Sequence, residues 1–159
     1  MRLEVATSDS LGVYLIGEIT LEMTERILRE THSDSRPQKM YLSTPGGDVG
    51  CALAIYDALR QHGHVTVIAT GNVSSAGVIV LLGGTERKAT PHARFLFHEL
   101  SLEGESTPYE QAELLASTEL VAQLYSERMT LTPAASAALL QGETRMDVEQ
   151  ARRLGLLTT

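Results

Sequence analysis

Short apolar runs alternate with helical patterns along the first two thirds of the chain, and this alternation limits the possible folds more than any other feature. Each run is bounded by Gly, Ser, Thr or Pro, as expected for buried strands; the runs are Val13 to Ile16, Met40 to Leu42, Val65 to Ala69 and Phe95 to Phe97. The helical patterns between them are LEMTERILRE, VGCALAIYDALRQ and a small-residue segment from Ser75. Strands alternating with helices predict repeated βαβ units, and therefore an α/β fold with a mainly parallel sheet.

The last third of the chain has a different pattern, which predicts a long helix over about 107–130. Thr107 is expected to cap this helix, with Pro108 at its first position and Glu110 completing a T-x-x-E capping box. Helical spacing puts its apolar side chains on one face, namely Leu114, Leu115, Val121, Leu124 and Tyr125. That face needs a partner, so we expect this helix to serve in self-assembly.

Shorter helices are predicted after Thr132 and Asp147, ending near Gly142 and Gly155. The chain of 159 residues has no internal repeat and no linker composition. Its length suits one domain over 1–159.

Composition excludes several classes of function. The net charge is −7 with no dense run of Lys or Arg, which argues against a nucleic-acid partner. No run approaches the roughly 18 apolar residues of a membrane span, and the N-terminus lacks the apolar core of a signal peptide. The lone Cys51 sits in a helical pattern as a packed thiol. These features predict a cytoplasmic protein with no membrane association.

A glycine-rich turn, STPGGDVG, follows the second apolar run. Pro45 stiffens the turn, while Gly46 and Gly47 permit backbone angles that a side chain would forbid and leave amides uncovered. Such amides at the start of a helix can hold an anion. Taken alone, the pattern is equally typical of a tight strand-to-helix turn.

A second strand-to-helix turn, GNVSSAGVIVLLGG, carries two hydroxyls among small residues. A serine hydroxyl there lies close to free amides at the helix start, including that of Ala76, and can attack a carbonyl whose oxygen those amides stabilise. The competing interpretation is that Ser74 or Ser75 simply caps the helix. His98 ends the apolar run in PHARFLFHEL and can act as a general base beside a serine. The other histidines, which lie in turns or at element ends, are given structural roles; they are His32, His62, His64 and His92.

Together these three motifs resemble those of the ClpP serine peptidases. STPGGDVGCALAIYDAL is similar to their S-P-G-G turn and following helix, GNVSSAGVIVLLGG to their G-x-A-A-S-M-G segment, and PHARFLFHEL to their P-x-(S/A)-R-x-x-x-H strand. The resemblance runs from about Val13 to Leu157, with the motifs in the same order. It implies a ClpP/crotonase-like fold with a projecting long helix.

The resemblance also implies a role for each matching position. The nucleophile falls on Ser75, the base on His98, and the oxyanion-hole amides on Gly47 and Ala76. Counting back from Gly155 places the third triad member on Glu143, where the family has aspartate. Asp147 and Glu99 remain alternative acids for that role.

For the whole protein, the resemblance implies a serine endopeptidase that cleaves unfolded proteins or short peptides inside an oligomeric chamber, without metal or organic cofactor. We expect a homo-oligomeric ring, with a heptamer as one possible form. The sequence does not decide between a single and a double ring. Family members usually carry a longer segment before the first strand, which meets an ATP-driven unfoldase, whereas ten residues precede Leu11 here. Coupling to a Clp-type ATPase is therefore left open.

Three other interpretations fit parts of the sequence. The chain could be an inactive, scaffold-like ring subunit, which the altered acid favours and the presence of Ser75 and His98 disfavours. A crotonase-like acyl-coenzyme A enzyme would use the two glycine turns but leave Ser75 and His98 without a role. A Ser-Lys pair would have to use Lys39 or Lys88, the chain's two lysines.

Overall fold

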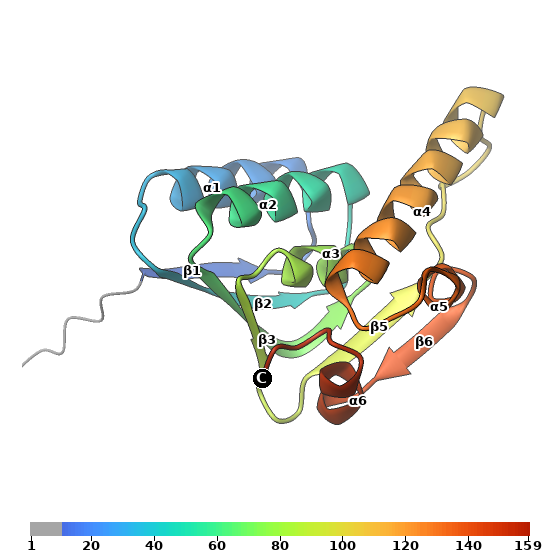
Figure 1. Ribbon diagram of the computed structural model, residues 1–159. Helices are drawn as coiled ribbons and strands as arrows, with labels where there is room; N and C mark the ends of the chain where they lie inside the picture. The colour runs from blue at the N-terminus through green and yellow to red at the C-terminus, as the bar shows by residue number, and fades with distance from the viewer. Residues whose placement is uncertain (1–10) are drawn as a thin grey trace, which may run out of the picture.

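The computed structural model describes residues 11–159 (Figure 1). In chain order the elements are β1 (Leu11–Ile16), α1 (Leu21–His32), β2 (Gln38–Thr44), α2 (Val49–His62), β3 (Val65–Ser74), α3 (Ala76–Leu82), β4 (Glu86–Ala89), β5 (Arg94–His98), α4 (Pro108–Arg128), α5 (Pro133–Ala138), β6 (Glu143–Met146) and α6 (Val148–Arg153). The described residues share one hydrophobic core. The expected domain limits of 1–159 stay a prediction, and their first ten residues lie outside the described part.

The sheet has six strands in the order β1-β2-β3-β5-β6, with β4 also paired to β3. All of its pairings are parallel except that of β5 with β6. The helices α1, α2 and α3 lie together on one face, and α4 projects from the body (Figure 1). This arrangement confirms the α/β fold with a mainly parallel sheet that the alternating pattern predicted.

Side chains alternate between the two faces of each strand, as the pleat requires. In β2, Met40, Leu42 and Thr44 are buried beneath the helices, whereas Lys39 is exposed on the opposite face. We call the face opposite α1 and α2 the open face. At β1 it presents two exposed apolar side chains, Tyr14 and Ile16.

The structure differs from the expected elements at several points. β3 extends to Ser74 because, after pairing with β4, it pairs residues 72–74 with β5. Two further strands, ERKA in β4 and ETRM in β6, were missed because they are short and highly charged. The helix expected to end near Gly142 ends at Ala138.

The long helix α4 has the predicted start. Thr107 accepts a hydrogen bond from the N–H of Glu110, whose carboxylate accepts one from the N–H of Thr107. Only its second half packs against the core, where Tyr125 meets Phe97 edge to face at 5.5 Å between ring centroids. Leu115 on the predicted apolar face is 61% exposed, because the first half of α4 projects beyond the core.

A buried arginine fastens the end of the chain to the sheet. The Arg87 guanidinium in β4 donates hydrogen bonds to the carbonyls of Leu156 and Gly155, both at 2.8 Å, and to that of Arg128 at 3.2 Å. Burial, together with the nearby Arg128 cation, lowers the pKa of Arg87 to about 10. Because these carbonyls have no comparable donor without it, Arg87 holds the segment after α6 and the end of α4 in place.

We expect replacement of Arg87 by methionine to lower the free energy of unfolding by about 3 kcal/mol, because buried carbonyls lose a charged donor. Urea unfolding followed by circular dichroism measures this difference. Lys88→Met is the matched control, since Lys88 is an exposed neighbour paired with Glu86 at 3.3 Å, and should change stability by less than about 1 kcal/mol. Equal losses in both variants would contradict the anchoring role.

Candidate active site

The glycine turn after β2 packs directly against the start of α3. Gly46 has φ +107° and Gly47 has φ +149°, angles that side chains rarely adopt. A Cβ on Gly47 would collide with the carbonyl oxygen of Ile19, and one on Gly46 would lie 2.9 Å from the Cβ of Ser75. Both positions therefore require glycine.

A short backbone bridge fixes this turn to the loop after β1. Ile19 donates its N–H to the carbonyl of Gly46 at 2.8 Å, and Asp48 donates its N–H to the carbonyl of Ile19 at 3.1 Å. The N–H of Gly47 takes no part in this bridge. The N–H of Ala76, as the first residue of α3, has no acceptor within its own helix. Among residues 11–159 no hydrogen bond from either of these two amides is seen, which leaves both available at the turn.

Ser75 occupies an unusual backbone conformation between β3 and α3. Its φ is +56°, and it is the one non-glycine residue with positive φ among residues 11–159. Its side chain makes no capping hydrogen bond, although it stands at the N-cap position of α3, while its N–H donates to the carbonyl of Leu96 in β5 at 2.8 Å. Strain of this kind costs on the order of 1–3 kcal/mol and is concentrated at functional sites. The capping interpretation is therefore wrong for Ser75, whose hydroxyl is left free.

His98 ends β5 with its ring held by the backbone. Its Nδ1 lies 2.6 Å from the carbonyl oxygen of Glu99. A carbonyl can only accept a hydrogen bond, so Nδ1 carries the proton in the neutral ring and Nε2 keeps its lone pair. This is the tautomer that a general base requires.

Gly47, Ser75 and His98 line one cleft of about 590 Å³. Its apolar walls come from the loop after β5 and from α4, through Leu100 and Leu114. Within residues 11–159 no hydrogen bond joins Ser75 to His98. The predicted nucleophile, the predicted base and one of the two predicted oxyanion donors thus line the same cleft. Neither Lys39 nor Lys88 lines this cleft.

The three candidate acids differ in their position relative to His98 and in their hydrogen-bond or ion-pair partners. Glu143 lies directly opposite His98 in the β5–β6 register, but its exposed carboxylate is 3.7 Å from the guanidinium of Arg145. Asp147 caps α6 and accepts a hydrogen bond from the N–H of Gln150 at 2.8 Å. Glu99 contacts His98 through its carbonyl. Of the three carboxylates, only that of Glu143 stands on the strand position facing His98 and is free of a capping role.

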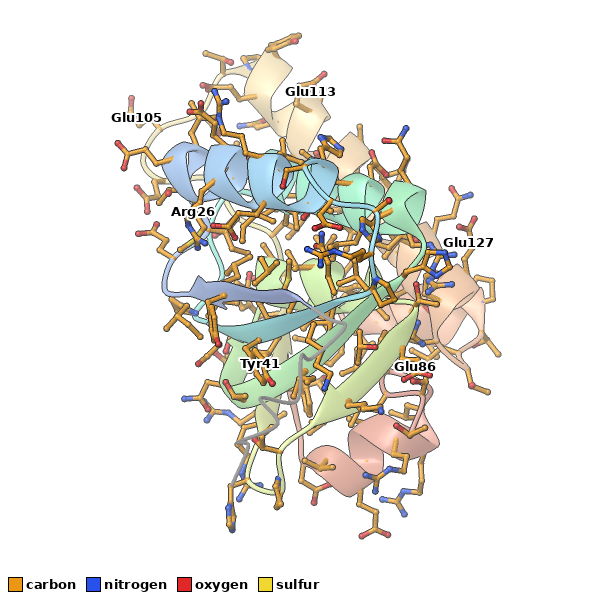
Figure 2. The ribbon with its side chains drawn as sticks, turned by 90° about the vertical axis from the view of Figure 1, so that its left-hand side faces the viewer. Arg26, Tyr41, Glu86, Glu105, Glu113 and Glu127 are labelled. Atoms are coloured by element: carbon orange, nitrogen blue, oxygen red, sulfur yellow. The ribbon has the colours of Figure 1, made fainter. Side chains whose placement is uncertain are left out.

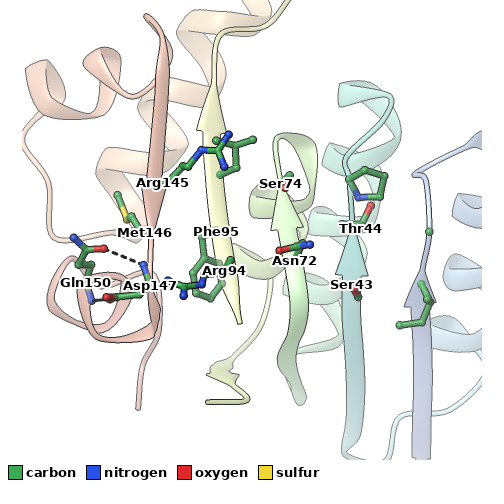
Figure 3. Close-up of a pocket in the computed structure, with 14 residues that line it drawn as sticks. Ser43, Thr44, Asn72, Ser74, Arg94, Phe95, Arg145, Met146, Asp147 and Gln150 are labelled. Carbon is green, nitrogen blue, oxygen red and sulfur yellow. Dashed lines mark hydrogen bonds between the residues drawn. The ribbon is translucent and has the colours of Figure 1, made fainter. Parts of the chain in front are cut away.

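A second cavity, of about 680 Å³, lies on the open face (Figure 3). Ser74 points into it, so the two adjacent serines serve different surfaces. Arg94 and Arg145 also line it. Sequence reasoning missed this cavity because its residues come from five strands. One sequence pattern could have indicated it. Side chains alternate between the two faces of a strand, so residues 94, 96 and 98 of β5 share one face.

None of the helices in residues 11–159 combines the length and apolar character that crossing a membrane would take.

The chain is similar to known proteins over most of its length. The family model described as Clp protease matches residues 7–159. An ATP-dependent Clp protease proteolytic subunit from Pleurastrum terricola is 29% identical over 157 residues, covering 91% of this chain and 80% of the relative. One from Chara vulgaris is 35% identical over 103 residues, covering 60% of this chain and 47% of the relative, so the chain spans about half of that protein.

Among solved structures, the ClpP1 N165D mutant from Listeria monocytogenes superposes with a TM-score of 0.84 at 22% identity, covering 92% of this chain and 88% of the other. At that identity the superposition shows the shared fold. The family match extends over nearly the whole chain and includes both glycine turns and the strand that ends at His98. The chain therefore belongs to the Clp protease family.

Proposed function

We propose that this chain is a serine endopeptidase that hydrolyses peptide bonds of unfolded proteins or short peptides inside an oligomeric chamber. The observation that carries the proposal is the free hydroxyl of Ser75, which a left-handed backbone presents to the same cleft as His98. The family match and the proteolytic-subunit names of the relatives support it.

The reaction follows from the positions of these groups. The Ser75 Oγ attacks the substrate carbonyl while His98 Nε2 takes its proton, and the N–H groups of Gly47 and Ala76 stabilise the oxyanion that forms. His98 then gives the proton to the leaving amine, so the peptide bond breaks and an acyl-enzyme remains on Ser75. Water, deprotonated by His98, then attacks that ester, and the acid product leaves as His98 returns the proton to Ser75 Oγ. No cofactor is needed for these steps.

We assign the third triad position to Glu143. Directly opposed residues in an antiparallel pair have Cβ atoms about 4.5–5.5 Å apart, so a rotation of its side chain away from Arg145 brings the carboxylate toward His98. In that state Glu143 would accept the hydrogen bond from Nδ1–H in place of the Glu99 carbonyl, and its charge would stabilise the imidazolium.

For the assembly we propose a homo-oligomeric ring, with heptamers as the expected form. The exposed apolar side chains of α4, Tyr109, Leu115 and Leu120, support a role of this helix in self-association. The relatives' names support an ATP-driven partner for whole substrates. The cytoplasm stays the predicted compartment, because the lone Cys51 is expected to be a packed free thiol.

A catalytically inactive scaffold subunit is the second candidate, and the pairing of Glu143 with Arg145 favours it. The acyl-coenzyme A alternative would leave Ser75 and His98 unused in the cleft that they share, and it is not carried further.

Hydrolysis assays separate the enzyme from the scaffold. We expect wild-type protein to cleave casein and a fluorogenic peptide without any ATPase, and Ser75→Ala and His98→Ala to lose at least about 1,000-fold in kcat, because each removes a group that acts in the transition state. Ser74→Ala is the matched control and should retain activity, since Ser74 points into the other cavity. A silent wild type, or activity that survives in Ser75→Ala, would overturn the proposal.

The role of Glu143 is tested by Glu143→Gln. We expect kcat to fall by about 100-fold or more, because an amide cannot stabilise the imidazolium of His98. Asp147→Ala serves as a control for the neighbouring carboxylate and should cost about 1 kcal/mol of stability through the lost cap while sparing kcat. A loss of less than tenfold in Glu143→Gln would show that the Glu99 carbonyl alone orients the base.

A further inference from the structure

The cleft that contains Ser75 and His98 carries charge of one sign. Its acidic lining residues come from three loops and from α4 and are Glu18, Asp48, Glu103, Glu110 and Glu113, whereas no Lys or Arg lines it. The neighbouring cavity on the open face differs, because Arg94 and Arg145 line it together with one acidic residue, Asp147 (Figure 3). The acidic lining is therefore a local property of the catalytic cleft.

Backbone features hold several of these carboxylates at the cleft. Glu18 precedes Ile19, whose N–H and C=O bridge the Gly46–Gly47 turn. Asp48 caps α2 by accepting a hydrogen bond from the N–H of Cys51 at 2.7 Å. Glu110 belongs to the capping box of α4. The carboxylates of Asp48 and Glu110 are thus held by hydrogen bonds, and the backbone beside Glu18 is fixed.

Other carboxylates at the cleft have no hydrogen-bond or ion-pair partner in the described part of the chain. Glu18, Glu103 and Glu113 are exposed, and in the described part of the chain their side chains make no hydrogen bond or ion pair. They are available to an incoming cation. Between them lie partly buried apolar residues, Val49, Leu100 and Leu114, which provide an apolar floor.

We infer that the cleft selects peptides in which Lys or Arg residues flank an apolar residue at the scissile bond. This inference rests on the proposed function, because it assigns a substrate class to the same site. A single exposed ion pair contributes little to binding. Several charges of one sign around a cleft act together, however, by raising the local concentration of an oppositely charged substrate and orienting it.

The test compares three internally quenched peptides of equal length, each with a central Leu-Ala bond flanked on both sides by Lys, Gln or Glu. At low salt we expect kcat/KM for the Lys peptide to exceed that for the Gln peptide by at least about fivefold, and the Glu peptide to be the poorest substrate. At 1 M salt, where the Debye length is about 3 Å, the ratio should fall below about twofold. Equal kcat/KM values for the Lys and Gln peptides at low salt would overturn the inference.

Matched variants distinguish the cleft from the overall charge of −7. The cleft variant combines Glu18→Gln, Glu103→Gln and Glu113→Gln. The control variant changes the net charge equally through Glu86→Gln, Glu127→Gln and Glu149→Gln; Figure 2 shows Glu86 and Glu127 well away from Glu113. We expect the Lys-to-Gln ratio of kcat/KM to collapse in the cleft variant and persist in the control variant. Equal changes in both would overturn the inference in favour of a general charge effect.

Peptide binding to the Ser75→Ala variant tests the charge preference of the cleft separately from hydrolysis. Fluorescence anisotropy with the same peptides should show tighter binding of the Lys peptide by the same fivefold margin, and this preference should disappear when the cleft substitutions are added. If hydrolysis is absent or independent of Ser75, the proposed function fails, and this binding measurement still decides the inference. Equal binding of the Lys and Gln peptides to Ser75→Ala would refute the acidic selectivity.

Discussion

The close contact between two strand-to-helix turns is the constraint on which the site depends. Gly46 and Gly47 bring the turn after β2 against Ile19 on one side and Ser75 on the other, at separations that leave no room for a Cβ. In an interior packed this closely, a displacement of one segment also displaces the backbone next to it. The turn therefore fixes the two amides, the loop carrying Glu18 and the backbone of Ser75 as a single unit.

Ser75 is strained because its surroundings over-determine its conformation. The hydrogen bond from its N–H to Leu96 ties it to β5, and Ala76 begins a helix that is buried along its whole length. With φ at +56°, the hydroxyl no longer caps that helix and is left for chemistry. The same strand β5 ends at His98, so one pairing between β3 and β5 places Ser75 and His98 at the same end of the sheet.

Much of this could be predicted from the sequence, because the fold and the motifs are local signals. Buried runs, the two glycine turns and the capping box of α4 each occupy consecutive residues, and each was placed correctly. The charged strands β4 and β6 were missed because tertiary pairing, not local propensity, makes ERKA and ETRM extended. Likewise, helical spacing could not reveal that the first half of α4 leaves the core and exposes Leu115. The partner of Glu143 and the acidic lining of the cleft depend on side chains from separate elements, which spacing alone does not bring together.

Labelling with a fluorophosphonate probe followed by mass spectrometry tests the central claim most directly, namely that the glycine turn holds Ser75 as a reactive nucleophile. Wild type should be labelled on Ser75. Gly63→Ala should be labelled equally fast, because Gly63 also has positive φ but open space around it, whereas Gly47→Ala should react more than about tenfold more slowly, because its Cβ displaces the turn. Labelling of another serine, or equal rates in Gly47→Ala and wild type, would contradict the account.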